Sequence, residues 1–301
     1  MRILSLFDGI CCGHLALERA GIKIDSYDAY EIEKNAIKAT QTNFPDVVHH
    51  GDVTKEDFTK YKDKIDLLIG GSPCQGFSFS GKMLNFSDPR SKLFFEYVRA
   101  LKEAEPKYFL LENVVMKKEY EEIITSYLGV KPIEINSSLV SAQNRRRLYW
   151  TNIPNVCQPT DKNIKLEDIL ENINFINPGA IRGRRLDKTD YRKDNDTKIP
   201  ISQCLEVRAT NTDKSNCLTT VDKDNVLTSL PIGRYPDAFK NKLPFRYYTT
   251  TEMCRLQTVP DDFLDMIPNG SARKALGNGW TVDVIAHIFS FLPDEYKNKE
   301  E

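Results

Sequence analysis

Residues 66–80, DLLIGGSPCQGFSFS, decide how the rest of the chain is interpreted. Their apolar run at 67–69 predicts a short buried strand, which ends at two glycines just before Pro73. Proline has a fixed φ and no amide hydrogen, so it stiffens the approach to Cys74. An open α/β sheet places its chemistry beyond the carboxyl ends of its strands, and Cys74 is therefore a candidate nucleophile. A buried structural cysteine, the commoner fate of this residue type, is the alternative.

Composition describes an ordinary globular protein, whose 301 residues can hold one large domain and a smaller one. A hydrophobic share of 40%, a charged share of 28% and a net charge of -1 exclude a strongly basic body. Any nucleic acid must therefore meet a local basic face. Seven irregularly spaced cysteines argue against a disulfide framework or a zinc ribbon. With no signal peptide and no membrane-length apolar stretch in the sequence, they favour a reducing, cytoplasmic location.

The first 30 residues have the pattern of a cofactor-binding unit. They predict a strand, a turn from Asp8 to Gly13, a helix and a second strand that ends at Glu31. The carboxylate of Glu31 could accept hydrogen bonds from both hydroxyls of a ribose, although a helix-capping role is an equal alternative. The turn lacks the GxGxxG spacing that holds a pyrophosphate. A nicotinamide dehydrogenase shares this opening but would not need the loop around Cys74.

A second group of candidates adjoins two later strands. Glu112 comes directly after the apolar strand 108–111, where partial desolvation would let it hold a proton near neutral pH. Arg145 and Arg147 lead into the strand 148–151 and share one face of an extended backbone, so they could hold a base carbonyl or a phosphate. The alternatives are a Glu112 that pairs with a nearby arginine and a basic triplet that is only a solvated face.

Beyond residue 151 the apolar periodicity weakens and polar residues dominate, which predicts a smaller domain over 152–269. Its compact basic group, Arg182, Arg184 and Arg185, suits phosphates. Its hydroxyl-rich ribbon, 210–226, could reach base edges in a major groove. A β-rich surface lobe without a reading role is the alternative.

The motifs, taken together and in order, resemble those of the cytosine-C5 DNA methyltransferases of bacteria and phages, with features similar to the vertebrate de novo branch. The resemblance runs from residue 3 to about residue 291. It rests on Phe-Asp-Gly-Ile at 7–10, Gly-Gly-Ser-Pro-Cys-Gln at 70–75, Glu-Asn-Val at 112–114, Gln-x-Arg-x-Arg at 143–147 and Gly-Asn at 277–278.

The resemblance implies a Rossmann-like, S-adenosylmethionine-dependent methyltransferase sheet formed by 1–151 and 270–301, and a mostly irregular or β target-recognition domain at 152–269. It implies methyl transfer to C5 of a flipped cytosine in a short duplex DNA site, through a covalent adduct between Cys74 and C6. The implied catalytic residues are Cys74, Glu112, Arg145 and Arg147. Arg147 would touch the base O2, and Arg145 would hold Glu112 or a phosphate. The implied cofactor-binding residues are Phe7, Asp8, Gly9, Ile10, Gly13, Glu31, Ile32, Asp52, Val53, Pro73, Leu93, Asn278 and Trp280. The expected DNA-binding residues are Gln75, Ser78, Arg182, Arg184, Arg185, Lys214, Asn216, Thr219 and Thr220.

The implied partner is double-stranded DNA, with a cognate restriction endonuclease as a further candidate and a monomer as the expected state. No membrane and no metal are implied. Two alternative functions remain open. A tRNA cytosine-C5 methyltransferase would carry similar motifs, and a catalytically inactive homologue would keep the fold and bind nucleic acid.

Overall fold

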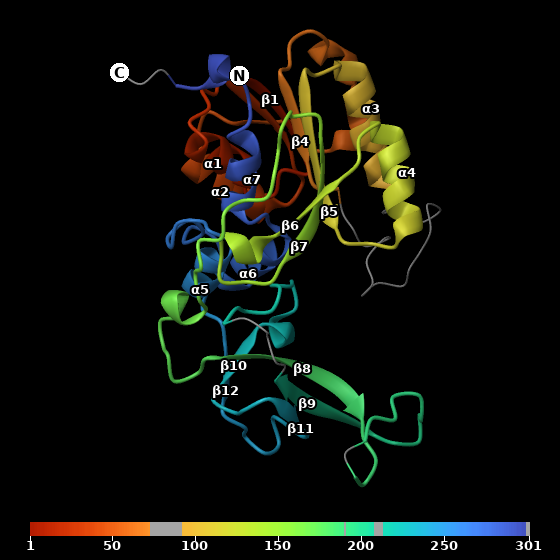
Figure 1. The fold of residues 1–301 in the computed structure, drawn as a ribbon, viewed down its shortest axis with the longest axis vertical. Helices are drawn as coiled ribbons and strands as arrows, with labels where there is room; N and C mark the ends of the chain where they lie inside the picture. Colours follow the sequence, from red (N-terminus) through yellow and green to blue (C-terminus); the bar gives the residue numbers. More distant parts are fainter. Residues whose placement is uncertain (73–91, 190, 208–212, 299–301) are drawn as a thin grey trace.

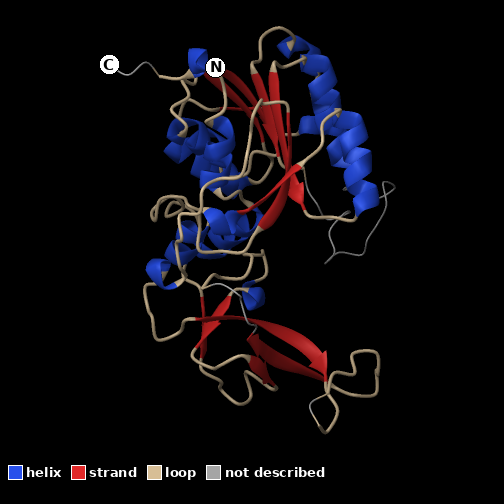
Figure 2. Ribbon diagram, in the orientation of Figure 1, coloured by secondary structure: helices blue, strands red, loops and turns tan. Residues whose placement is uncertain are grey.

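The computed structural model describes residues 1–72, 92–189, 191–207 and 213–298. They form a larger α/β lobe, which contains the N-terminus and the last helix, and a smaller β lobe that projects from it (Figure 1, Figure 2). Four expected site residues, Pro73, Cys74, Gln75 and Ser78, lie outside the described residues. None of the helices in the described part of the chain has the length and apolar character that a membrane crossing requires.

The larger lobe is built on a seven-stranded sheet. Its strands are Arg2–Leu6 (β1), Ser26–Tyr30 (β2), Val48–His49 (β3), Leu67–Gly70 (β4), Tyr108–Val114 (β5), Ile133–Asn136 (β6) and Arg146–Thr151 (β7). The spatial order is β3-β2-β1-β4-β5-β7-β6, and the first five strands of that order run parallel. Only β7 reverses, because it pairs antiparallel with both β5 and β6. The predicted sheet of a methyltransferase is confirmed.

Helices cover both faces of this sheet, which explains why every residue of β1 after Arg2 and every residue of β4 is buried. Three helices pack on one face: Cys12–Arg19 (α1), Lys34–Asn43 (α2) and Val282–Phe289 (α7). Two pack on the other: Lys92–Ala104 (α3) and Lys118–Leu128 (α4) (Figure 1). Two more lie toward the smaller lobe: Thr250–Leu256 (α5) and Asn269–Asn278 (α6). Short 3-10 turns occur at Val53–Lys55, Phe58–Tyr61, Ser137–Leu139, Glu167–Ile169, Asp222–Asp224 and Asp294–Tyr296.

The smaller lobe is a five-stranded antiparallel sheet. Its strands are Asn177–Arg185 (β8), Ile201–Val207 (β9), Val226–Thr228 (β10), Gly233–Tyr235 (β11) and Phe245–Tyr247 (β12), in the order β11-β9-β8-β10-β12. Ile181, Leu205 and Val226 belong to a hydrophobic cluster that is separate from the two clusters of the larger lobe. The expected β character of this region is therefore confirmed.

Packing places the boundary between the lobes away from the expected limits of 152 and 269. Ile153 and Ile169 are buried in the same cluster as α1 and α7, and so are Met253 and Phe263. The residues with a core of their own therefore lie within 177–247. The difference arises because short apolar stretches flanking the polar region carry too little periodicity to reveal which core they join.

Candidate active site

The turn after β1 has an unusual backbone. Phe7, Gly9 and Cys11 have φ values of 57°, 61° and 61°, in the left-handed region. Glycine adopts this conformation freely, but Phe7 and Cys11 carry a β-carbon and are strained in it. Such strain persists where the surrounding structure holds it, and it is concentrated at functional sites. The turn therefore has the character of a binding loop.

Asp8 lies inside this turn with an incomplete set of hydrogen bonds. Its Oδ1 accepts from the hydroxyls of Ser5 at 2.6 Å and Tyr27 at 2.7 Å. Its Oδ2 is buried and has no hydrogen-bond partner among the described residues. Burial raises the pKa of Asp8 to about 6, against the opposing effect of these hydrogen bonds. A cationic group that reached Oδ2 would complete the site.

At the end of β2, the carboxylate of Glu31 is held in place by backbone amides. Glu31 accepts hydrogen bonds from the amides of Gly9 at 2.8 Å, Ile32 at 2.7 Å and Glu33 at 2.8 Å, so its carboxylate is fixed beside the turn. The Ile32 side chain is 69% exposed, which leaves an apolar surface open next to Glu31. Asp52 caps a short helical turn through its Oδ1. The structure thus fixes Glu31 beside the turn after β1, with the exposed Ile32 next to it in the chain.

Because Gly13 has no side chain, Trp280, which is distant in the sequence, can pack close to this turn. A β-carbon at Gly13 would lie 2.4 Å from Ile69 Cδ1, 2.9 Å from the Tyr27 hydroxyl and 3.6 Å from Trp280 Cζ3. Only glycine fits there without displacing buried atoms. The benzo edge of the indole therefore lies close to the cofactor turn.

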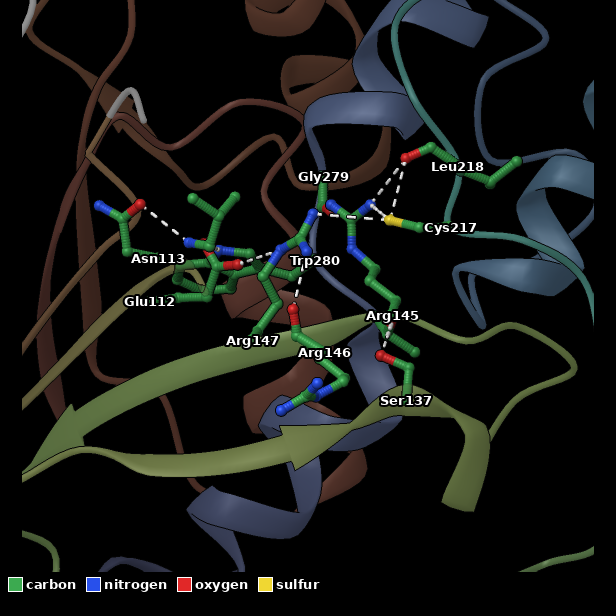
Figure 3. Close-up of polar contacts among 12 residues, drawn as sticks. Glu112, Asn113, Ser137, Arg145, Arg146, Arg147, Cys217, Leu218, Gly279 and Trp280 are labelled. Carbon is green, nitrogen blue, oxygen red and sulfur yellow. Dashed lines mark hydrogen bonds and ion pairs between the residues drawn. The ribbon is translucent and has the colours of Figure 1, made fainter. Parts of the chain in front are cut away.

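Glu112 is held by two donors at the carboxyl end of the sheet (Figure 3). Its Oε1 forms an ion pair with Arg147 Nε at 3.0 Å, and its Oε2 accepts from Trp280 Nε1 at 3.2 Å. Glu112 is buried, with 9% of the residue exposed. The arginine-paired Glu112 that the sequence left open is thus present, and the pair lies at the predicted site.

Asn113 connects Glu112 to the segment that leads to Cys74. Its Nδ2 donates to Ser72 Oγ at 3.2 Å, and the Asn113 side chain also caps the amide of Val114 at 2.8 Å. Both Ser72 and Asn113 are buried. Ser72, two residues before Cys74 in the sequence, and the carboxylate of Glu112 are therefore fixed to the same strand end.

Arg145 does not hold Glu112, contrary to the expectation. Its guanidinium donates to the carbonyls of Leu218 at 3.0 Å, Gly277 at 3.3 Å and Gly279 at 2.8 Å (Figure 3). Only 3% of the residue is exposed, so a phosphate would not reach it in this arrangement. Arg145 instead joins the ribbon, through Leu218, to the end of α6. Of the two arginines, Arg147 is the one that pairs with Glu112.

Cys217 is a site residue that sequence reasoning missed. Its Sγ lies 3.4 Å from Arg145 Nη1 and 3.8 Å from Arg147 Nη2 (Figure 3). Burial would raise the pKa of the thiol, but the two guanidinium groups outweigh burial and lower it. No sequence motif predicts the contact of Cys217 with the two arginines, because it forms only when the ribbon packs beside Arg145 and Arg147 in the folded protein.

The three arginines of the basic group, Arg182, Arg184 and Arg185, bind acceptors within the smaller lobe. Arg184 binds Glu206 through two nitrogens at 2.7 and 3.1 Å, and Arg185 donates to the carbonyls of Thr197 and Ile199. Arg182 is the more exposed, and it pairs with Asp224 at 3.1 Å. The three arginines therefore do not form the open phosphate site that was expected.

The ribbon is also more buried than expected. Lys214 is 6% exposed and donates to the carbonyls of Ser141 and Ile164, so it does not present a charge to DNA. Burial lowers the pKa of its amine. Thr219 is half-buried and bonds within the ribbon, whereas Thr220 is exposed and Asn216 is half-buried. Thr220 and Asn216 stay candidates for contact with nucleic acid.

The remaining cofactor candidates lie at different depths. Ile10 and Val53 are buried, Phe7 and Leu93 are half-buried against the core on the α3 face, and Asn278 is exposed at the end of α6. Ile10 and Val53 therefore pack into the core of the larger lobe, and of these five residues only Asn278 is exposed.

Comparison with known proteins decides the family. A model of the C-5 cytosine-specific DNA methylases matches residues 1–293. The chain belongs to this family. Among its relatives, the type II methyltransferase M1.ScrFI of Lactococcus lactis subsp. cremoris is 32% identical over 319 residues, covering 95% of this chain and 76% of the relative. The type II methyltransferase M.NgoBV of Neisseria gonorrhoeae is 31% identical over 198 residues, covering 57% of this chain and 46% of the relative. The resemblance inferred from the motifs is confirmed.

Solved structures of other methyltransferases share the fold of this C-5 methylase. The Entamoeba histolytica methyltransferase EhMeth superposes with a TM-score of 0.66 at 18% identity, over 99% of each chain. A DNMT2 variant from Spodoptera frugiperda gives 0.65 at 20% identity, over 97% of this chain and 99% of its own. At these identities the likeness establishes the fold alone.

Proposed function

We propose that this chain transfers the methyl group of S-adenosylmethionine to C5 of an extruded cytosine in duplex DNA, through a covalent adduct between Cys74 and C6. The observation that carries the proposal is the position of Glu112, held by Arg147 and Trp280 at the strand end that Asn113 ties to Ser72, two residues before Cys74 in the sequence. Membership of the C-5 cytosine-specific DNA methylase family supports the reaction class.

The turn after β1 fits S-adenosylmethionine. The unpartnered Oδ2 of Asp8 suits the ammonium of the methionine end, and the fixed carboxylate of Glu31 suits a ribose. Ile32 would pack on the adenine, and Asp52 would accept from its amino group. When bound, the cofactor supplies an electrophilic methyl group. The protein side of the reaction then depends on what Glu112, Arg147 and Cys74 do to the base.

Cytosine C5 is a poor nucleophile, so the base must be activated. Addition of the Cys74 thiolate to C6 pushes electron density onto the ring, and a proton from Glu112 to N3 neutralises it. Arg147 would hold Glu112 and the O2 side of the base. After methylation a base removes the C5 proton and the thiolate leaves, which restores the aromatic ring. The target must leave the duplex first, at about a few kcal/mol of lost stacking and pairing.

The substrate can be tested with a labelled methyl donor. We expect label to enter duplex DNA and not tRNA, and duplex DNA containing 5-fluorocytosine to form an adduct that mass spectrometry maps to Cys74. A Cys74→Ser variant should form no adduct. Label in tRNA alone would support the tRNA enzyme, and binding of DNA without methylation or adduct would support an inactive homologue. Sedimentation of the free protein tests the expected monomer, and co-purification tests a restriction endonuclease partner.

An Asp8→Asn variant tests the cofactor site and its pH dependence. Because burial raises the pKa of Asp8 from 3.8 to about 6, the folded state favours the neutral acid. Its contribution to stability is complete below pH 3.8 and is lost as the pH rises through about 6. At pH 7.5 the ionised group therefore costs the free protein up to about 3 kcal/mol. We expect Asp8→Asn to raise the free energy of unfolding at pH 7.5 relative to wild type, while weakening cofactor binding at least about tenfold.

Urea titrations at pH 4.5 and 7.5, without cofactor, measure the first effect, and calorimetry with S-adenosylmethionine measures the second. The gain in stability should be larger at pH 7.5 than at pH 4.5. A change in the free energy of unfolding that is the same at both pH values would show that altered hydrogen bonding, and not the charge of Asp8, decides the result.

A further inference from the structure

The indole of Trp280 makes an unusual contact with the carboxylate of Glu112. Trp280 lies in the turn between α6 and α7, and its Nε1 donates to Glu112 Oε2 at 3.2 Å (Figure 3). Gly71, which directly follows β4, makes room for this contact. A β-carbon on Gly71 would lie 2.9 Å from Trp280 Nε1 and 3.2 Å from Glu112 Oε2. The hydrogen bond is therefore built into the packing of three separate segments.

The two oxygens of Glu112 have chemically different partners. Oε1 faces the charged guanidinium of Arg147 at 3.0 Å, which favours a negative charge on that oxygen. Oε2 faces a neutral N–H. A carboxyl oxygen has more than one acceptor site, so Oε2 can carry a proton and still accept from the indole. Oε2 is thus the oxygen better suited to hold and release a proton.

We propose that Trp280 is a positioning residue that fixes Glu112 Oε2 as the oxygen that donates its proton to N3 of the target cytosine. The inference rests on the proposed function, in which Glu112 protonates the base. As the Cys74 thiolate adds to C6, the proton leaves Oε2 for N3, and Glu112 becomes a carboxylate bound by Arg147 and Trp280. When the thiolate departs, the proton returns from N3 to Oε2. Glu112 thus regains its proton by the end of the cycle, while the methyl group and the base that takes the C5 proton are those of the proposed function.

The same indole meets the cofactor turn through a different edge. A β-carbon at Gly13 would lie 3.6 Å from Cζ3, on the benzo ring, whereas Glu112 is bound by the pyrrole N–H. A phenylalanine in place of Trp280 would retain an aromatic ring in this space and remove the N–H. Cofactor binding and Glu112 positioning can therefore be separated experimentally.

The experiment compares Trp280→Phe with Trp150→Phe. The chain has two tryptophans, and Trp150 is a matched control because it is fully buried and donates its own N–H to Thr125 at 3.0 Å, away from Glu112. We expect Trp280→Phe to lower kcat about 10- to 100-fold, because a hydrogen bond to a charged group is lost, with the Kd for S-adenosylmethionine within about threefold of wild type. Trp150→Phe should change kcat less than about threefold.

Two outcomes would overturn the proposal. One is an unchanged kcat in a folded Trp280→Phe protein. The other is a loss of cofactor affinity by the same factor as the loss of kcat/KM, which would assign the indole to the cofactor alone.

A second measurement does not depend on activity or on the folding of Trp280→Phe. In Trp150→Phe protein, Trp280 is the only tryptophan, so its fluorescence reports its own surroundings. Adding Glu112→Gln should change that emission, and an identical spectrum would contradict the contact. If wild-type protein methylates no nucleic acid, the proposed function fails, while the fluorescence result still tests the contact between Trp280 and Glu112.

Discussion

Replacing Glu112 by glutamine is expected to lower the rate of methyl transfer to DNA by about 10²- to 10⁴-fold, the range that loss of a general acid produces. Glutamine has nearly the same size and keeps an oxygen for Arg147, so the fold should remain. It cannot give a proton to N3, and the ring would keep the charge that thiolate addition creates. Single-turnover transfer of labelled methyl measures the effect directly.

Glu134→Gln is the matched control for this variant. Glu134 also pairs with an arginine from β7, because it binds Arg146 at 2.5 and 2.9 Å, but this pair is exposed and lies outside the site. Its loss should change the rate less than about twofold, since exposed ion pairs contribute little. A Glu112→Gln protein that retained more than a tenth of wild-type activity would remove Glu112 from the proposed proton transfer.

Arg145→Met is expected to lower the free energy of unfolding by about 3–5 kcal/mol. The guanidinium is buried and donates to the carbonyls of Leu218, Gly277 and Gly279, so methionine would leave three buried acceptors without these donors. Lysine is no substitute, because one ammonium cannot reproduce the planar set of donors. Urea unfolding of the cofactor-free protein measures the loss.

Arg146→Met provides the comparison for Arg145, because Arg146 is the next residue, at the start of β7, and its side chain is 61% exposed. Its effect should stay below about 1 kcal/mol. Equal stability of the two variants would show that the carbonyl contacts of Arg145 contribute nothing to the junction. A lower DNA affinity in Arg145→Met, measured below its unfolding range, would further indicate that Arg145 orders the ribbon at 213–221.

Several elements could be predicted because their causes are local in the sequence. The strand–turn–helix opening, the acid at the end of β2 and the position of Glu112 after an apolar strand all follow from periodicity and turn chemistry. Parallel strands place their carboxyl ends at one edge of the sheet, which is where an open α/β sheet holds its chemistry. The structure shows Glu31 and Glu112 at strand ends on that edge.

Other features depend on segments that meet only after folding. Arg145 and Arg147 are two residues apart and were expected to share one face of an extended backbone, so the sequence offered no way to choose which one binds Glu112. In the structure Arg145 donates to the carbonyls of Leu218 and Gly279, and Arg147 is the arginine that pairs with Glu112. Likewise Arg184 and Lys214 look available for DNA in the sequence, yet Glu206 and buried carbonyls bind them.

The sequence by itself determined the methyltransferase sheet, the family and the residue types of the site, because strand periodicity and motif order depend only on residues that are near one another in the sequence. Tertiary structure alone decided the partner of each charged group, the place of Cys217 between two guanidiniums and the contact of Trp280 with Glu112. The physical reason is that a buried charge binds whichever donors and acceptors packing brings within about 3 Å, and these come from distant segments.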